Sequence, residues 1–320
     1  MDKSKIGIVF GSLTPPEGLT AVAARAEQLG FGEVWFSEDC FFTGGVSGLT
    51  LLLAATERVP AGLGLASVVT RHPAMLAMEL AGLARIYPGR VRATIGLGNG
   101  FWLQQLGLTP AKPLTAVKET LDVLRELLAG GKVNRTTSTH HYGDIKLEFP
   151  PEQVPQLWFG AVNEKALRVS GEKADGVLLS VLAGPSYITW ARGLVDEAGR
   201  DLPLTAFVLA AVDDDDQAAR EAVRGAVGFF LKAECHTALV GQSPFAADIR
   251  KRVAALGPDE ELIVEDKWVD EFAVAGSPLK VRAQLQDLLD AGATSLSLWL
   301  FPPDQASAQL ERLANDVLTD

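Results

Sequence analysis

Residues 61–100 read AGLGLASVVTRHPAMLAMELAGLARIYPGRVRATIGLGNG, and this stretch decides the fold class. An apolar run over 62–69 is followed by a helical pattern, and a second apolar run over 91–97 ends in Gly98, Asn99 and Gly100. Continuous apolar runs are typical of parallel strands buried on both faces, and such strands need a crossover that can hold a helix. Ligands of parallel sheets lie at the carboxyl ends of the strands. Residues 67–71 and 98–100 are therefore expected to line any small-molecule site.

The same alternation of strand and helix patterns continues along the whole chain. Eight such units, closed on themselves, predict a (β/α)₈ TIM barrel that forms a single domain over residues 1–320. An open doubly wound sheet is the alternative, and it is disfavoured because no G-x-G-x-x-G motif follows the first strand. The predicted strands cover residues 6–10, 33–36, 62–69, 91–97, 157–161, 176–180, 204–212 and 296–300.

Two segments interrupt this alternation and are predicted to be insertions, after the fourth and the seventh strands. The first, at about 130–151, is predicted to be a β-hairpin or long loop over the barrel mouth, with a turn at 142–144. The second, at about 236–275, is polar and irregular, with short helical pieces. Residues 101–104, which are bulky, are predicted to form a loop.

Composition excludes several classes of partner. The net charge is −11, and neither nucleic acid nor an anionic membrane is expected as a partner because both require clustered Lys and Arg. Two cysteines, Cys40 and Cys235, are too few for a disulfide framework. No apolar run approaches the ~20 residues of a membrane span, and the N-terminus lacks the features of a signal peptide. We therefore expect a cytoplasmic protein.

Six segments, in order along the chain, together resemble the bacterial luciferase-like family. They are GFGEVWFSED (30–39), SVVTRHP (67–73), PGR (88–90), GLGNG (96–100), SGEKADG (170–176) and DLLDAGA (287–293). The chain resembles most the branch that uses the deazaflavin coenzyme F420, which includes methylenetetrahydromethanopterin reductase.

This resemblance implies an F420-dependent oxidoreductase that transfers a hydride between the deazaflavin and a C=N or C=C bond. The substrate would be a small organic molecule, a biosynthetic intermediate or a modified peptide. An FMN-dependent luciferase-like monooxygenase is the alternative, because FMN-binding members share the barrel. A non-catalytic binding barrel is the second alternative. The family also implies a homodimer, with the small-residue helix at 74–84 as a candidate contact.

The resemblance implies where the cofactor would bind. Residues 67–68 match the position of a non-prolyl cis peptide bond behind the isoalloxazine-type ring, and residues 98–100 would approach the pyrimidine edge of that ring. The turn at 161–163 would present backbone N–H groups to the phosphate at a helix N-terminus. A buried strand end and an ordinary glycine turn are the alternative interpretations. The implied cofactor-binding residues are Ser67, Val68, Gly98, Asn99, Gly100, Ala161, Val162, Asn163 and Ser180.

Two adjacent carboxyls, Glu38 and Asp39, follow the second predicted strand and are the candidate catalytic residues. A carboxyl that faces the pocket could exchange the proton that accompanies hydride transfer. Some relatives carry histidine where this chain has Asp39, so its role departs from that pattern, and a solvated or helix-capping acid is the alternative.

Other residues near the predicted mouth have simpler expected roles. Arg71 is expected to pair with a carboxylate or phosphate, and His72 to orient the turn into the following helix. No metal is expected, because adjacent histidines at 140–141 cannot both face one ion from a strand. The candidates for an apolar pocket wall are Phe41, Phe42, Trp102 and Trp190.

Overall fold

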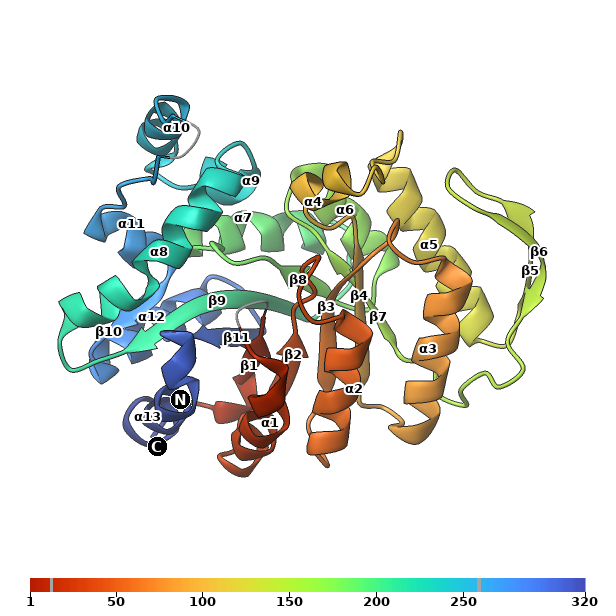
Figure 1. Cartoon of the computed structure of the whole chain (residues 1–320), viewed down its shortest axis with the longest axis horizontal. Coiled ribbons are helices and arrows are strands. Elements are labelled where there is room, and N and C mark those ends of the chain that lie inside the picture. The colour runs from red at the N-terminus through yellow and green to blue at the C-terminus, as the bar shows by residue number, and fades with distance from the viewer. Residues whose placement is uncertain (12–13, 258–259, 320) are drawn as a thin grey trace.

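Eight parallel strands close into a barrel in the computed structural model, which describes residues 1–11, 14–257 and 260–319 (Figure 1). The ring closes because β9 pairs with β8 on one side and with β11 on the other. The predicted TIM barrel is therefore confirmed, and the open sheet is excluded. The strands in ring order are β1 (Ile6–Phe10), β2 (Glu33–Phe36), β3 (Ala61–Ser67), β4 (Val91–Gly96), β7 (Gln156–Gly160), β8 (Val177–Leu179), β9 (Leu204–Val212) and β11 (Ser295–Leu300).

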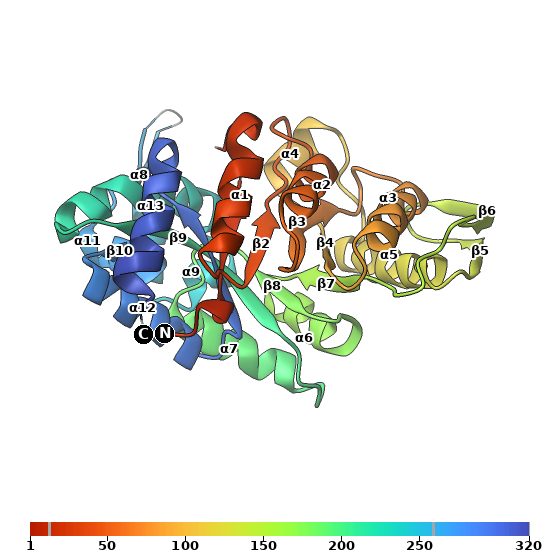
Figure 2. The same cartoon turned by 90° about the horizontal axis from the view of Figure 1, so that it is seen from below.

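Helices cover the outside of the barrel (Figure 2). Side-chain N-caps set where two of these helices begin. At α3 the His72 Nδ1 accepts from the Ala74 N–H at 3.2 Å, and at α8 the Asp215 carboxylate accepts from the Gln217 N–H at 2.9 Å. In the described ranges, every helix falls short of what a membrane span requires. The barrel helices are α1 (Leu19–Gln28), α2 (Gly45–Ala55), α3 (Pro73–Ile86), α5 (Pro113–Leu128), α6 (Glu164–Lys173), α7 (Pro185–Asp196), α8 (Asp216–Glu234), α12 (Pro278–Asp290) and α13 (Ala306–Arg312).

The first insertion is an antiparallel hairpin of β5 (Lys132–Thr136) and β6 (His141–Lys146), as predicted, but it does not cover the mouth. It lies on the outside of the barrel beside α3 and α5 (Figures 1 and 2). Tyr142, predicted in the turn, is a buried strand residue, and its ring centroid lies 5.2 Å from that of His72 at the start of α3. The predicted location was wrong because this ring is buried against the helices.

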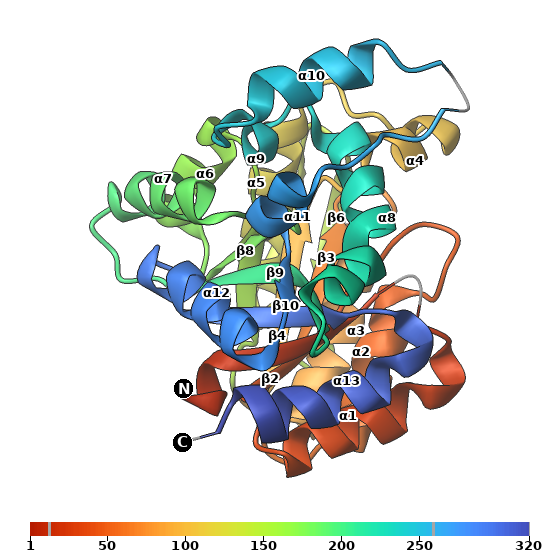
Figure 3. The ribbon, with the colours of Figure 1, turned by 90° about the vertical axis from the view of Figure 1, so that its left-hand side faces the viewer.

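The second insertion returns to the barrel edge and to its mouth. Its short strand β10 (Val274–Gly276) extends the sheet beside the end of β9. Its first helix, α9 (Ala238–Gly241), begins where the Ala238 N–H donates to the Asn163 side chain at 3.0 Å. Figure 3 shows α9 and α10 at the same end of the barrel as α4. The remaining elements are α10 (Ala246–Ala254), α11 (Asp266–Phe272), α4 (Gly100–Gln105), η1 (Lys3–Lys5), η2 (Pro16–Gly18), η3 (Pro303–Gln305) and η4 (Leu313–Val317).

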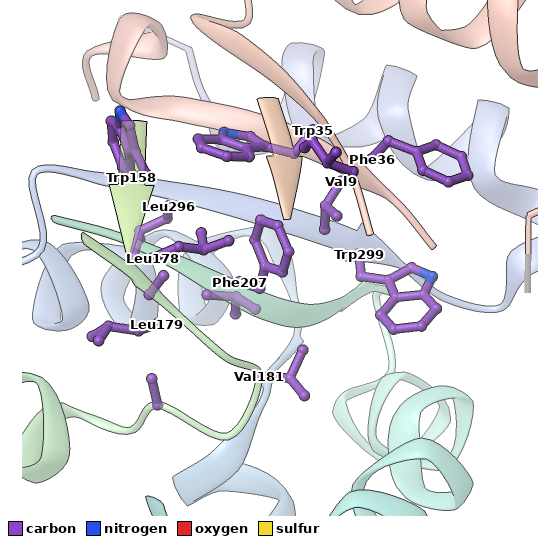
Figure 4. Packing of buried hydrophobic residues seen from close by; sticks show 14 of the residues in the cluster. Val9, Trp35, Phe36, Trp158, Leu178, Leu179, Val181, Phe207, Leu296 and Trp299 are labelled. Carbon is purple, nitrogen blue, oxygen red and sulfur yellow. The ribbon is translucent and has the colours of Figure 1, made fainter. Parts of the chain in front are cut away.

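The barrel interior is filled, so it is not a pore. The ring centroids of Trp35 and Trp158 lie 5.3 Å apart, and the ring centroid of Phe207 lies 5.9 Å from that of Trp35 (Figure 4). Nearer the amino ends of the strands, the buried Glu33 carboxylate pairs with Arg92. This packing leaves the carboxyl ends of the strands as the place for a site.

Candidate active site

Leu65 forms the floor of the mouth at the carboxyl ends of the strands. A bulge between Leu63 and Ala66 shifts the register of β3 against β4, and the Gly64–Leu65 peptide bond within it is cis. The Leu65 side chain lies over glycines of the next two strands, because a Cβ built on Gly96 or Gly160 would lie 2.7 or 2.6 Å from Leu65 Cδ2. Leu65 is half-buried. It therefore presents an apolar surface to anything bound in the mouth.

The predicted cis bond at Ser67–Val68 is wrong, since the structure has it three residues earlier, at Gly64–Leu65. Hydrogen bonds instead tie residues 67–68 to the end of β4. Ser67 Oγ donates to the Leu97 carbonyl at 2.5 Å, and the Val68 N–H donates to the Gly96 carbonyl at 3.0 Å. The sequence did carry one signal for the true position, because a glycine inside a strand pattern often marks a bulge.

The segment at 98–100 turns back over the mouth and starts a helix. Gly98 has a φ of +90°, which favours glycine, and a Cβ there would lie 3.2 Å from Ser67 Cβ. Asn99 Oδ1 accepts from the Phe101 N–H at 2.9 Å and so caps the short helix α4. The predicted loop at 101–104 is therefore wrong, because the cap at Asn99 makes this segment helical. The Asn99 side-chain NH₂ has no acceptor among the described residues.

The turn between β7 and α6 offers a helix N-terminus at the same end of the barrel. Asn163 precedes α6 but does not cap it, because its Oδ1 accepts from α9. The Glu164 carboxylate accepts from Arg168 at 3.1 and 3.2 Å and so is held by its own helix. Over the described ranges, the N–H groups of Glu164 and Lys165 have no acceptor. An anion with acceptor oxygens fits such a helix end.

Two further predicted cofactor residues precede this helix, and one follows the neighbouring strand. The Ala161 N–H donates to the Leu178 carbonyl at 3.3 Å, which joins the ends of β7 and β8. The buried Tyr187 hydroxyl donates to the Val162 carbonyl at 2.7 Å and fixes this turn. Ser180, just past β8, is half-buried. The structure thus brings residues 161–163 and Ser180 to adjacent strand ends.

Glu38 is held in an ion pair. Arg71 donates to both of its carboxylate oxygens, each at 2.7 Å, and the Gly45 N–H at the start of α2 donates at 2.6 Å. The predicted pairing of Arg71 with a carboxylate is confirmed. Both carboxylate oxygens of Glu38 are therefore committed to neighbouring elements. A catalytic role of either residue stays a prediction.

A cavity of about 260 Å³ lies beside this ion pair. Asp39, which is half-buried, lines it together with Glu38, Arg71 and Cys40. Burial raises the pKa of the Cys40 thiol, and the negative charges of Glu38 and Asp39 raise it further, whereas Arg71 opposes them. The thiol form of Cys40 is therefore favoured over the thiolate.

Aromatic side chains border this cavity, and two of the four predicted candidates line it. Phe41 and Phe42 line it, and the Phe42 and Trp102 rings meet edge to face with centroids 6.5 Å apart. Phe41 has a φ of +74°, a left-handed conformation that is uncommon for an aromatic residue. Trp190 instead packs on Tyr187 of α7.

The described residues contain no group of three or more His, Cys, Asp or Glu that could hold a metal ion. His140 lies at the turn of the outer hairpin, with its ring centroid 4.6 Å from that of His72. The role predicted for His72, orienting the turn into α3, is confirmed by its cap.

Comparison with known proteins shows which protein family this chain matches. The model of the luciferase-like monooxygenase family matches residues 6–295. A 5,10-methylenetetrahydromethanopterin reductase of Methanolobus tindarius is 29% identical over 301 residues, which cover 91% of this chain and 92% of that protein. The coenzyme F420-dependent tetrahydromethanopterin reductase from Methanopyrus kandleri has a similar fold, with a TM-score of 0.80, 23% identity and 98% of each chain covered. An F420-dependent secondary alcohol dehydrogenase, solved in complex with an F420-acetone adduct, also has a similar fold. Its TM-score is 0.80 and its identity 19%, with 99% of this chain and 100% of that chain covered.

Proposed function

Because the chain belongs to the luciferase-like monooxygenase family, we propose that it is an F420-dependent oxidoreductase that transfers a hydride to or from a C=N or C=C bond of a small substrate. The names of the relatives compared above favour F420. The observation that carries the proposal is the Leu65 side chain over Gly96 and Gly160, because this half-buried apolar group at the strand ends would stack against a flat ring.

The residues around this floor suit the rest of the cofactor. The Asn99 side-chain NH₂ would meet a ring carbonyl at the rim, and the α6 N-terminus would meet the phosphate. Bound F420 supplies a carbon-centred hydride donor, which favours two-electron chemistry over oxygen activation. Asp39 would exchange a proton with the substrate, and the aromatic rim would exclude water from it.

Turnover of reduced F420 tests the reaction class. Purified protein mixed with reduced F420 and a panel of cyclic imines and activated alkenes should oxidise the deazaflavin without consuming oxygen. Oxygen consumption with reduced FMN, and none of the F420 reaction, would favour the monooxygenase alternative.

Alanine at Gly160 should weaken cofactor binding. The new Cβ would lie 2.6 Å from Leu65 Cδ2, so the Leu65 side chain must move and the surface proposed for the ring would change. We expect the dissociation constant for F420 to rise by about tenfold, or ~1.4 kcal/mol. Gly193→Ala on α7 is the matched control, because a Cβ there meets nothing within 4 Å. Equal F420 affinity of the Gly160→Ala variant and wild type would show that the ring does not lie on this floor.

We also propose that the protein pairs as a homodimer through α3. Met75 and Met78 are each 52% exposed and Ile86 is 68% exposed, and all three share a helix face with Gly82. An apolar stripe of this kind on an outer helix marks an interaction surface.

A charge in this stripe should separate the dimer. Met78→Glu is expected to halve the mass measured by light scattering after size exclusion, because two copies of the charge would be buried together. Leu279→Glu, at an 83% exposed position of α12, is the control and should leave the mass unchanged. A wild-type protein that is already a monomer, or a Met78→Glu variant that remains a dimer, would contradict this interface.

A further inference from the structure

We propose that Glu234, the last residue of α8, makes the phosphate site at the α6 N-terminus selective for a phosphodiester over a terminal phosphate. A phosphodiester, as in F420, carries one negative charge, whereas the terminal phosphate of FMN carries close to two at pH 8. The inference rests on the proposed function, because it takes the α6 N-terminus as the place where the phosphate binds. It names a residue and a physical reason for the choice between the two cofactors.

Backbone hydrogen bonds place Glu234 beside the start of α6. The Thr237 N–H and hydroxyl donate to the Glu234 carbonyl at 2.9 and 2.8 Å. The next residue, Ala238, donates its N–H to the Asn163 side chain at 3.0 Å, and Asn163 directly precedes α6. The end of α8 is therefore joined through α9 to the helix end that is proposed to meet the phosphate.

The side chain of Glu234 is directed toward the same turn. Its negative charge adds to burial in raising the pKa of Tyr187. The Tyr187 hydroxyl in turn donates to the Val162 carbonyl at 2.7 Å, one residue before Asn163. The carboxylate therefore acts on the turn that presents the unbonded N–H groups at the start of α6.

No cation is paired with this carboxylate. Burial raises the pKa of Glu234, the Thr237 hydroxyl opposes this by less, and no Lys, Arg or His of the described residues forms an ion pair with it. On α6 itself, Arg168 pairs with Glu164, and Lys165 is exposed. Solvent screens an exposed charge more than a half-buried one, so the effect of Glu234 on a bound anion is the less weakened of the two.

A stabilising role does not account for Glu234. A half-buried carboxylate without a cation costs free energy, and the dipole at the carboxyl end of α8 disfavours a negative charge there. Glu234→Gln is therefore expected to leave the thermal midpoint unchanged or to raise it. Groups that lower stability in this way are common at functional sites.

The selectivity follows from how Coulomb energy depends on charge. The repulsion between Glu234 and a bound phosphate is proportional to the charge of the phosphate, so it is twice as large for two charges as for one. Removal of the carboxylate should therefore improve the binding of a compound with two charges by the square of the improvement for one charge. A compound without phosphate should be unaffected.

Three compounds with one ring and different charges test this. They are riboflavin, its 5′-methylphosphate with one charge, and FMN with close to two, at pH 8 and low salt. The same three compounds are also made with the ring of F420, and fluorescence titration gives all dissociation constants. Wild type should bind the methylphosphate at least as tightly as the terminal phosphate, although the α6 N-terminus alone would favour two charges.

Glu234→Gln should bind the methylphosphate about threefold more tightly than wild type and the terminal phosphate about tenfold more tightly, with the phosphate-free compound within twofold. Glu172→Gln removes an exposed carboxylate at the other end of α6 and is the matched control, which should change none of the three.

The outcomes separate this inference from the proposed function. A wild-type preference for the terminal phosphate, or a Glu234→Gln variant that changes all three compounds equally or none, would overturn the inference and leave F420 turnover untouched. If Glu234→Gln fails to fold, the wild-type order of affinities decides. The expected charge pattern in the riboflavin compounds, with no binding of those that carry the F420 ring, would uphold the role of Glu234 and overturn the proposed function. Binding of neither set would contradict both.

Discussion

Asparagine in place of Asp39 is expected to lower kcat for F420-linked hydride transfer by about 10²- to 10⁴-fold, the range that general acid–base groups contribute. Asp39 borders the cavity in the loop that follows β2, and β2 pairs with β3, the strand that carries Leu65. Asparagine keeps the size and polarity of this side chain but cannot exchange a proton with the substrate.

The pH profile distinguishes this role from a structural one. Wild-type kcat should show an ionisation that the Asp39→Asn variant lacks, whereas Glu38→Gln should keep that ionisation and lower the thermal midpoint, because Glu38 joins Arg71 to the start of α2. An Asp39→Asn enzyme with wild-type kcat, or with the same ionisation, would remove Asp39 from the chemistry.

Alanine in place of Glu33 is expected to lower the free energy of unfolding by about 3–5 kcal/mol, the usual cost of breaking a buried ion pair. The Glu33 carboxylate is 4% exposed, pairs with Arg92, and accepts from the Ser295 and Ser297 hydroxyls, each at 2.9 Å. The guanidinium of the half-buried Arg92, whose centre lies 5.1 Å from the centroid of the Trp158 ring, would be left without its partner.

Urea denaturation measures this loss. Glu33→Gln should cost less than alanine, because an amide oxygen still accepts from the serines. The double variant Glu33→Leu/Arg92→Leu should recover part of the stability, since no buried charge remains. Removal of the exposed Glu311 carboxylate, which pairs with Arg25, is the control and should change little. A Glu33→Ala variant with the same urea midpoint as wild type would show that the Glu33–Arg92 pair does not stabilise the fold.

The strands were predictable because a strand that is buried on both faces is a continuous run of apolar residues in the sequence. The runs at 6–10 and 204–212 match β1 and β9 residue for residue. The strand β10 was missed because it is only three residues long, lies at the end of the irregular insertion and pairs with a strand far away in sequence. The location of the hairpin was wrong because the sequence predicted a turn at 142–144 and did not show that Tyr142 is buried in a strand.

The site was predictable only in part, for a similar reason. Ligands bind at the carboxyl ends of parallel strands, and this rule indicated the right end of the barrel. The pairing of Arg71 was expected because it lies at this end. The Leu65 floor was missed because it depends on two glycines of neighbouring strands, at 96 and 160, and on a bulge in the pairing of β3 with β4. No local pattern brings these three residues together.

Titration of the purified protein with oxidised F420 and, separately, with FMN tests the central claim most directly, with the cofactor fluorescence followed to saturation. We expect F420 to bind at least about tenfold more tightly than FMN, and Gly160→Ala to remove most of this advantage while Gly193→Ala does not. FMN that binds more tightly than F420, or no binding of either cofactor, would contradict it.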